Sequence, residues 1–213
     1  MIVKDNQRGR ENAARVIANG GVIAFRTDTF YGLGVDPLNQ KAVNAIRELK
    51  GREEAKPILL LISDVSEVAR FIASPSALFK AVAIHHWPGP ITLVGVACPQ
   101  LPEELTAGTG TIGVRLPNDE NVRTLVRACG GALTATSANL SGSPPARTAK
   151  DAEKYFPRGL GLIIDSGEVS ATQPSTVLDL SGKPRLIRAG IVTREDLERT
   201  LGPYSLTGPK PVR

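Results

Sequence analysis

The chain has 213 residues, of which 41% are hydrophobic and 22% charged, a composition that favours one globular domain and argues against disorder. Its longest apolar run, residues 57–62, is too short to span a bilayer, and the N-terminus lacks a signal-peptide pattern, so we expect a cytoplasmic protein. The net charge of +5 favours polyanionic partners such as nucleotides, pyrophosphate or RNA without choosing among them. With only two cysteines and two histidines, a structural zinc site is not expected, and the cysteines are expected to be free thiols.

Apolar β-type runs alternate with helical patterns along the chain, which predicts an α/β layered architecture. In chain order we expect helices over 9–19, 40–50, 65–72, 76–86, 122–129 and 149–156, with a last helix from Thr193. The expected strands cover 22–25, 58–62, 91–96, 111–116, 133–136, 162–165, 176–180 and 184–188. Residues 1–202 are expected to form one domain, followed by a flexible tail over 203–213.

Several of these strands lead into polar loops that contain glycine, and ligands of open α/β sheets bind beyond strand ends. The sequence contains neither a P-loop nor a Gly-x-Gly-x-x-Gly fingerprint. His85 and His86 lie on a predicted helix, which argues against a Ser-His-Asp triad. We therefore expect any chemistry to depend on positioning and charge neutralisation rather than on a covalent nucleophile.

Three loops could form the site, and each also has a structural interpretation. Residues 26–34 combine hydroxyls, an aspartate and glycines, which suit either a tight turn bonded to its own backbone or a polar rim around a ligand. Residues 50–57 hold three cations, which suit a triphosphate, although lysine and glycine are also ordinary helix-ending residues. Residues 136–148 carry hydroxyls, an amide and Arg147, which suit phosphate or a plain surface loop. Arg188, at a strand end, would need an anion or a carboxylate if it is buried.

Taken in order, seven short motifs resemble those of the YrdC/TsaC family, and the resemblance extends from about Ala13 to Leu197. The motifs are residues 27–33, 50–52, 87–92, 114–117, 137–142, 175–177 and 188–190. The resemblance implies a twisted, open, mixed α/β sheet with helices packed around it and a concave, positively charged cavity. It also implies a reaction in which L-threonine, bicarbonate and ATP give L-threonylcarbamoyl-AMP and pyrophosphate. The product serves a partner complex that modifies tRNA.

The resemblance further assigns roles to individual residues. The expected catalytic residues are Lys50 and Arg52. The expected ATP-binding residues are Lys50, Arg52, Ser137, Asn139 and Arg188. The residues expected around threonine or its carbamate are Thr27, Tyr31, Lys56, Arg115 and Ser175. A Mg²⁺ ion on the phosphates is expected, held mainly by phosphate oxygens and water because no acidic cluster provides a cage.

Two features depart from the family pattern. Many relatives carry a histidine shortly after the 114–117 motif, where this chain reads Pro117-Asn118-Asp119-Glu120. Long relatives also have a further C-terminal domain, and this chain is expected to correspond to the short form. We expect Lys50 and Arg52 to be exposed cations, so that replacing either with alanine would lower activity far more than stability.

Two other functions fit parts of the sequence. A basic concave surface could bind double-stranded RNA or tRNA without catalysis, although aromatic residues make up only 4% of the chain, which argues against a base-stacking platform. The chain could also be a carbamoyl-transfer relative, like the similar domain of hydrogenase maturation proteins, which usually lies within a much longer chain.

Overall fold

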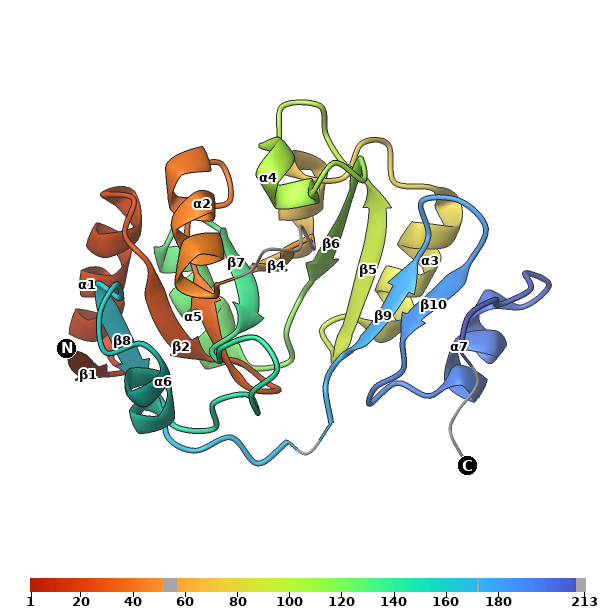
Figure 1. The fold of residues 1–213 in the computed structure, drawn as a ribbon. Helices are drawn as coiled ribbons and strands as arrows, with labels where there is room; N and C mark the ends of the chain where they lie inside the picture. The colour runs from red at the N-terminus through yellow and green to blue at the C-terminus, as the bar shows by residue number, and fades with distance from the viewer. Residues whose placement is uncertain (52–56, 172, 210–213) are drawn as a thin grey trace.

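The structure, a computed structural model, describes residues 1–51, 57–171 and 173–209. Its central feature is a ten-stranded mixed sheet that runs across the molecule as one open, twisted layer (Figure 1). Helices pack around this sheet, so the predicted α/β class is confirmed. The strand order is β1-β8-β2-β3-β7-β4-β6-β5-β9-β10.

The strands are short, and most fall where the sequence predicts them. Their bounds are β1 Ile2–Lys4, β2 Ile23–Arg26, β3 Tyr31–Gly34, β4 Leu59–Ile62, β5 Ile91–Val96, β6 Thr111–Arg115, β7 Ala132–Ser137, β8 Leu162–Asp165, β9 Thr176–Asp179 and β10 Arg185–Arg188. The pairs β1–β8, β8–β2, β4–β6 and β5–β9 are parallel. The other neighbours are antiparallel. Strand β7 joins the two halves of the sheet because it pairs with β3 on one side and β4 on the other.

The helices divide between the two faces of the sheet. Their bounds are α1 Gln7–Ala18, α2 Gln40–Leu49, the 3₁₀ helix η1 Val65–Arg70, α3 Ala77–His86, α4 Glu103–Thr106, α5 Glu120–Ala128, α6 Ala149–Tyr155 and α7 Arg194–Leu201. Helices α1 and α5 form one apolar core with Ile23, Phe25 and Leu61 of the sheet. The intervening strand residues Ala24 and Leu60 point to the opposite face, where they join the larger core.

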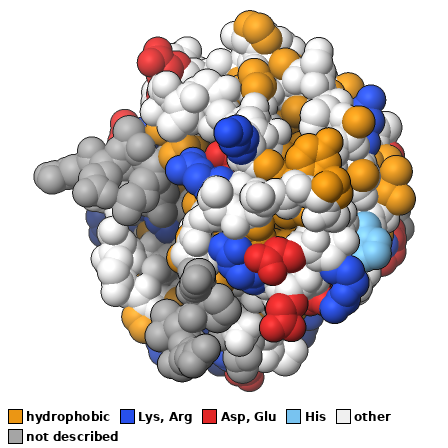
Figure 2. Space-filling view, turned by 90° about the vertical axis from the view of Figure 1, so that its right-hand side faces the viewer, with side chains coloured by type: hydrophobic (Ala, Val, Ile, Leu, Met, Phe, Trp, Pro, Cys, Tyr) orange, Lys and Arg blue, Asp and Glu red, His pale blue; other side chains and the backbone are white. Residues whose placement is uncertain are grey.

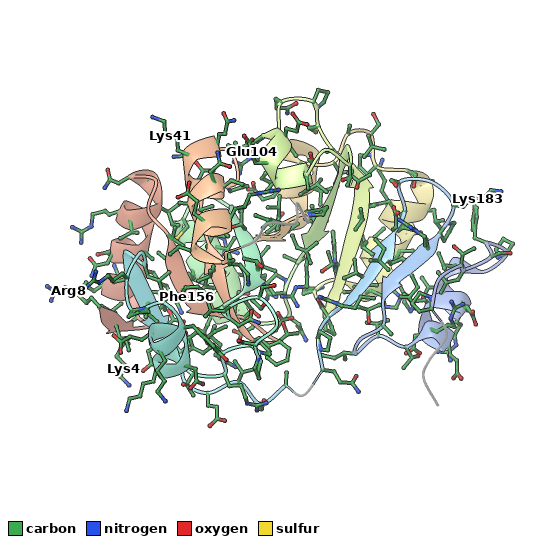
Figure 3. All side chains as sticks on the ribbon, in the orientation of Figure 1. Lys4, Arg8, Lys41, Glu104, Phe156 and Lys183 are labelled. Atoms are coloured by element: carbon green, nitrogen blue, oxygen red, sulfur yellow. The ribbon has the colours of Figure 1, made fainter. Side chains whose placement is uncertain are left out.

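Polar side chains fix where several helices begin. Asn6 Oδ1 accepts a hydrogen bond from Gly9 N at 2.9 Å, and Thr148 forms a reciprocal capping box with Asp151. The cap predicted at Thr193 is confirmed, since its side chain accepts from the backbone N–H of Asp196. A hydrogen bond joins α2 to α4: Gln40 Nε2 donates to Glu104 Oε1 at 2.6 Å. Glu104 is labelled near the top of the view in Figure 3.

Four elements differ from the sequence prediction. Strands β1 and β3 and the short helix α4 were not predicted, and residues 31–34 were wrongly taken as loop. The two glycines of β3 explain that error, because glycine is uncommon in strand interiors. At position 34 a glycine is required by close packing, because a Cβ on Gly34 would lie 2.7 Å from Phe25 Cε1. The segment 65–72, predicted as a helix, forms the 3₁₀ helix η1.

The C-terminal segment contacts the edge of the sheet as far as it is described. Leu186 N donates to Thr207 O at 2.9 Å, and Thr207 N donates to Pro184 O at 3.1 Å. The flexible tail predicted for 203–213 stays a prediction, and its residues 210–213 lie outside the described part.

Cys98 and Cys129 are free, as predicted, and burial raises the pKa of Cys129 to about 12. In the described part of the chain, every helix is too short or too polar to cross a membrane.

The contact between α1 and β1 gives a stability test. A Cβ on Gly9 would lie 2.1 Å from the carbonyl oxygen of Lys4, so Gly9→Ala must shift the helix or the strand. We expect it to lower the free energy of unfolding by about 1–3 kcal/mol, although alanine is the better helix former. Arg8→Ala is the control, because Arg8 is exposed on the same turn (Figure 3) and should cost less than about 0.5 kcal/mol. Urea unfolding of both variants measures the difference, and equal stabilities would contradict the packing described here.

Candidate functional site

A cavity of about 440 Å³ lies on the face of the sheet that α1 and α5 also cover. It extends along this face as far as β9 and β10. Its lining comes from the β2–β3 turn, strands β4 to β7, the segment before β9, and β10. Six of the predicted site residues line it: Thr27, Tyr31, Arg115, Ser137, Ser175 and Arg188. Residues from distant parts of the chain therefore meet at one site, as the motifs predict.

The β2–β3 turn is held together by the hydroxyl of Thr27. Thr27 Oγ1 donates to Phe30 O at 2.7 Å and accepts from the backbone N–H groups of Thr29 and Phe30 at 3.1 and 3.2 Å. The structural interpretation of this loop thus holds for Thr27, which is almost fully buried. It does not hold for Asp28, whose carboxylate turns toward Arg115 instead of the local backbone.

Arg115 and Asp28 form a buried ion pair beside the cavity. Arg115 Nη1 lies 3.1 Å from Asp28 Oδ1, but the two groups are not aligned as a hydrogen bond. Within the described residues, Arg115 Nη1 and both Asp28 carboxylate oxygens therefore have no hydrogen-bond partner. Burial lowers the pKa of Arg115, and the charge of Asp28 acts in the opposite direction. This guanidinium has donor capacity that an anionic ligand in the cavity can use.

Arg188 and Ser175 form a second polar pair at the cavity. Arg188 Nε donates to the carbonyl oxygen of Ser175, and its Nη2 donates to Ser175 Oγ, both at 3.0 Å. These acceptors are neutral. Arg188 is exposed as a residue and its hydrogen bonds are only partly buried, so the structure does not show the buried arginine that would need a carboxylate or an anion. Burial and the neighbouring charge of Arg115 both lower the pKa of Arg188. Two guanidinium groups therefore lie close enough to repel each other.

Lys50 joins the end of α2 to the loop after β7. Its Nζ donates to Ser137 O and, at 3.3 Å, to Asn139 Oδ1. Ser137 Oγ donates to the same Asn139 oxygen at 2.5 Å. The structure thus brings together three residues expected at the nucleotide. Lys50 is only 2% exposed, so our expectation of an exposed cation was wrong. Arg52 and Lys56 lie outside the described residues.

Two further side chains connect the segment before β9 to the rest of the site. Tyr31 Oη donates to Gly167 O at 2.9 Å and accepts from Ser166 N at 3.3 Å, while its residue lines the cavity. Burial raises the pKa of Tyr31 to about 12. Arg147 donates to Val169 O at 2.6 Å and to Ala171 O at 3.3 Å. Through these two hydrogen bonds the Arg147 guanidinium holds the backbone of residues 169 and 171 in place. The sequence had suggested a phosphate contact for this side chain instead.

Sequence reasoning did not assign Thr29 and Thr92, although both line the cavity and are buried. Both belong to motifs already noted, at 27–33 and 87–92, but a threonine in a strand or turn has no distinctive ligand signature. Among the described residues, no group of three or more His, Cys, Asp or Glu side chains could hold a metal ion.

An open α/β sheet with the buried Arg115, the exposed Arg188 and several hydroxyls around one cavity is typical of proteins that bind a small anionic ligand. A family model named Sua5/YciO/YrdC, described as telomere recombination, matches residues 15–190. A threonylcarbamoyl-AMP synthase of Thiobacillus denitrificans is 37% identical over 78% of this chain and 87% of its own length. The crystal structure of P. abyssi Sua5 complexed with L-threonine is 31% identical and has a TM-score of 0.91 over 97% of this chain and 62% of that one.

The chain belongs to the Sua5/YciO/YrdC family. Its relatives differ in length: it spans 56% of the threonylcarbamoyl-AMP synthases of Pyrococcus abyssi and Bacillus subtilis, each 34% identical. E. coli YciO has a TM-score of 0.78 at 25% identity, over 90% of this chain and 94% of that one. The predicted family and fold are therefore confirmed.

Because the Tyr31 phenol is buried, we expect it to ionise at a higher pH than an exposed tyrosine. Because its folded pKa lies above the ordinary value of 10, the stabilisation from the neutral phenol is complete below pH 10 and is lost as pH rises toward 12. The tyrosinate absorbance of the native protein, read immediately after a pH jump, should contain a component with a midpoint near pH 12. Tyr31→Phe should remove this component, and Tyr204→Phe, which alters an exposed tyrosine, should retain it. A Tyr31→Phe curve that keeps the late component would contradict this assignment.

Proposed function

We propose that this chain is a threonylcarbamoyl-AMP synthase, which joins L-threonine, bicarbonate and ATP and releases pyrophosphate. The observation that carries the proposal is its similarity to proteins of that name, at 37% identity over 78% of the chain for one and 34% over 89% for another. The buried arginine with an unpaired donor at the cavity supports it, since threonine, its carbamate and ATP are all anionic or carry carboxylates.

The reaction needs positioning and charge neutralisation more than acid–base chemistry. The threonine nitrogen, after losing a proton, bonds to the bicarbonate carbon, and water leaves to give the carbamate. A carbamate oxygen then attacks the α-phosphorus of ATP, and pyrophosphate departs with the bonding electrons. Developing negative charge on pyrophosphate is stabilised by fixed cations, which is the usual basis of such catalysis.

Within this proposal, the site residues divide into two groups. Arg115 would hold the threonine carboxylate, with Thr27, Tyr31, Lys56 and Ser175 around threonine or its carbamate. The nucleotide would contact Lys50, Arg52, Ser137, Asn139 and Arg188, with Lys50 and Arg52 offsetting charge on the leaving pyrophosphate. Lys50 and Arg188 support an assignment of this kind because each places positive charge beside neutral oxygens, while the Nη1 of Arg115 makes no hydrogen bond within the described residues.

The setting of the reaction is also part of the proposal. A Mg²⁺ ion would accompany ATP, bound mostly by phosphate oxygens and water. The product would pass to a partner complex that modifies tRNA, and the enzyme would act in the cytoplasm.

The alternative of an RNA-binding module without catalysis is not favoured. On the face shown in Figure 2, acidic and hydrophobic side chains are interspersed with the basic ones. A HypF structure shares the fold at 19% identity and a TM-score of 0.74.

The activity is tested by incubating the protein with ATP, bicarbonate and L-threonine and measuring pyrophosphate. We expect release that requires both threonine and bicarbonate, because the nucleophile is the carbamate formed from them. Release that does not depend on threonine would overturn the proposed function. Release driven by carbamoyl phosphate would instead support a carbamoyl-transfer activity.

Lys50→Ala tests the nucleotide side of the site. We expect a loss of pyrophosphate release of roughly 100-fold or more, since one fixed cation at a transferring phosphate carries that much. We also expect the free energy of unfolding to fall by about 1–3 kcal/mol, because Ser137 O and Asn139 Oδ1 lose a buried donor. Lys41→Ala is the control: Lys41 is exposed on the same helix (Figure 3), and its loss should change neither property. Activity per folded molecule within about threefold of wild type would remove Lys50 from the reaction.

A further inference from the structure

Thr92 on β5 has a buried hydroxyl with no hydrogen-bond partner in the part of the chain that the structure describes. Thr92 lines the cavity and is only 1% exposed. Such a hydroxyl is unfavourable in a folded protein unless something else supplies its partner. No role was assigned to it from the 87–92 motif.

The sheet register places Thr92 beside Arg115. Leu93 pairs with Val114 across the antiparallel strands β5 and β6. Because the strands run in opposite directions, the residue before Leu93 lies opposite the residue after Val114, which places Thr92 opposite Arg115. Both side chains belong to the cavity face, as do Val94 and Gly113 two residues further along the strands. Side chains directly opposite each other in such a pair have Cβ atoms about 4.5–5.5 Å apart. The two unpaired donors, Thr92 Oγ1 and Arg115 Nη1, are therefore cross-strand neighbours.

Gly113 leaves the space that Thr92 occupies. A Cβ added at Gly113 would lie 2.9 Å from Thr92 Cγ2, so any larger residue there would press on the threonine methyl group. The methyl group packs against this glycine, and packing of this kind restricts χ1 of a β-branched residue. The hydroxyl is thus held in a defined direction by the shape of its own strand pair.

A carboxylate would satisfy both unpaired donors at once. It offers two charged oxygens, one for a guanidinium N–H and one for a hydroxyl, whereas an alcohol offers one neutral oxygen whose hydrogen bonds are weaker, and an ammonium group accepts none. We infer that the Thr92 hydroxyl donates a hydrogen bond to the carboxylate of the amino-acid substrate, beside Arg115. The inference rests on the proposed function, which supplies that substrate, and adds Thr92 to the residues that contact it.

Paired binding measurements test this role. L-Threonine and L-threoninol differ in that the carboxylate of the first is a hydroxymethyl group in the second. For Thr92→Val, which keeps the shape and removes the hydroxyl, we expect threonine affinity to fall about tenfold, the loss typical of one hydrogen bond to a charged group. Threoninol affinity should change by less than about threefold, and Thr92→Ser should restore most of the preference for threonine. Isothermal calorimetry provides both affinities.

Thermal unfolding of the ligand-free protein adds an independent readout. Thr92→Val removes a hydroxyl that has no partner, so its melting temperature should equal or exceed that of wild type. Thr134→Val on β7 is the matched control, because Thr134 is fully buried and its Oγ1 accepts from Val35 N at 3.0 Å. That variant should melt at a lower temperature and keep the wild-type preference for threonine.

The possible outcomes separate the inference from the function. A Thr92→Val protein that keeps the wild-type ratio of threonine to threoninol affinity overturns the inference, whatever its melting temperature. A lower melting temperature with that ratio unchanged would show that the hydroxyl bonds within the protein. The carboxylate of Asp28, which lies beside Arg115 and has no hydrogen-bond partner among the described residues, would then be the acceptor to test. Wild-type protein that neither binds threonine nor requires it for pyrophosphate release would instead mean that the proposed function has failed.

Discussion

The pairing of β7 with both β3 and β4 is the contact on which the site depends. Gly32 lies opposite Ser137 in one pair, and Leu59 lies opposite Ala135 in the other, so β7 makes one sheet out of two halves. Because the sheet is continuous, the β2–β3 turn on one side and β5, β6 and β9 on the other border the same cavity. A slip of one residue in β7 would turn Ser137 to the opposite face and remove it from the cavity.

Charge inside the cavity is only partly compensated by the protein. Arg115 has Asp28 beside it, while Arg188 is hydrogen-bonded to the carbonyl and hydroxyl of Ser175. A buried cation such as Arg115 is unfavourable without compensation, and burial accordingly lowers the pKa of its guanidinium. Catalytic and binding sites are regions where proteins tolerate such incomplete satisfaction, because a ligand completes it.

Most of the fold could be predicted from the sequence, because the hydrophobic periods of helices such as 40–50 and strands such as 91–96 are strong and local. Strand β3 could not, since its Gly34 is required by a contact with Phe25 that only the folded sheet creates. For the site, ordered motifs identified the residues that line the cavity, while the burial of Lys50 and the pairing of Asp28 with Arg115 depend on tertiary packing. Arg147 illustrates the limit: a loop rich in hydroxyls suggested phosphate, and only the structure shows that two of its guanidinium nitrogens donate to the carbonyls of residues 169 and 171.

The hydrogen bonds of Lys50 have a consequence for how a ligand would be bound. A lysine side chain carries about 2 kcal/mol of rotamer entropy, which a binding site built from a mobile lysine loses each time it binds. Here Ser137 O and Asn139 Oδ1 already hold the ammonium group, so that ordering occurs once, when the chain folds. Folding stability and ligand affinity are thereby linked through a single side chain, and a ligand meets a cation whose position is set in advance.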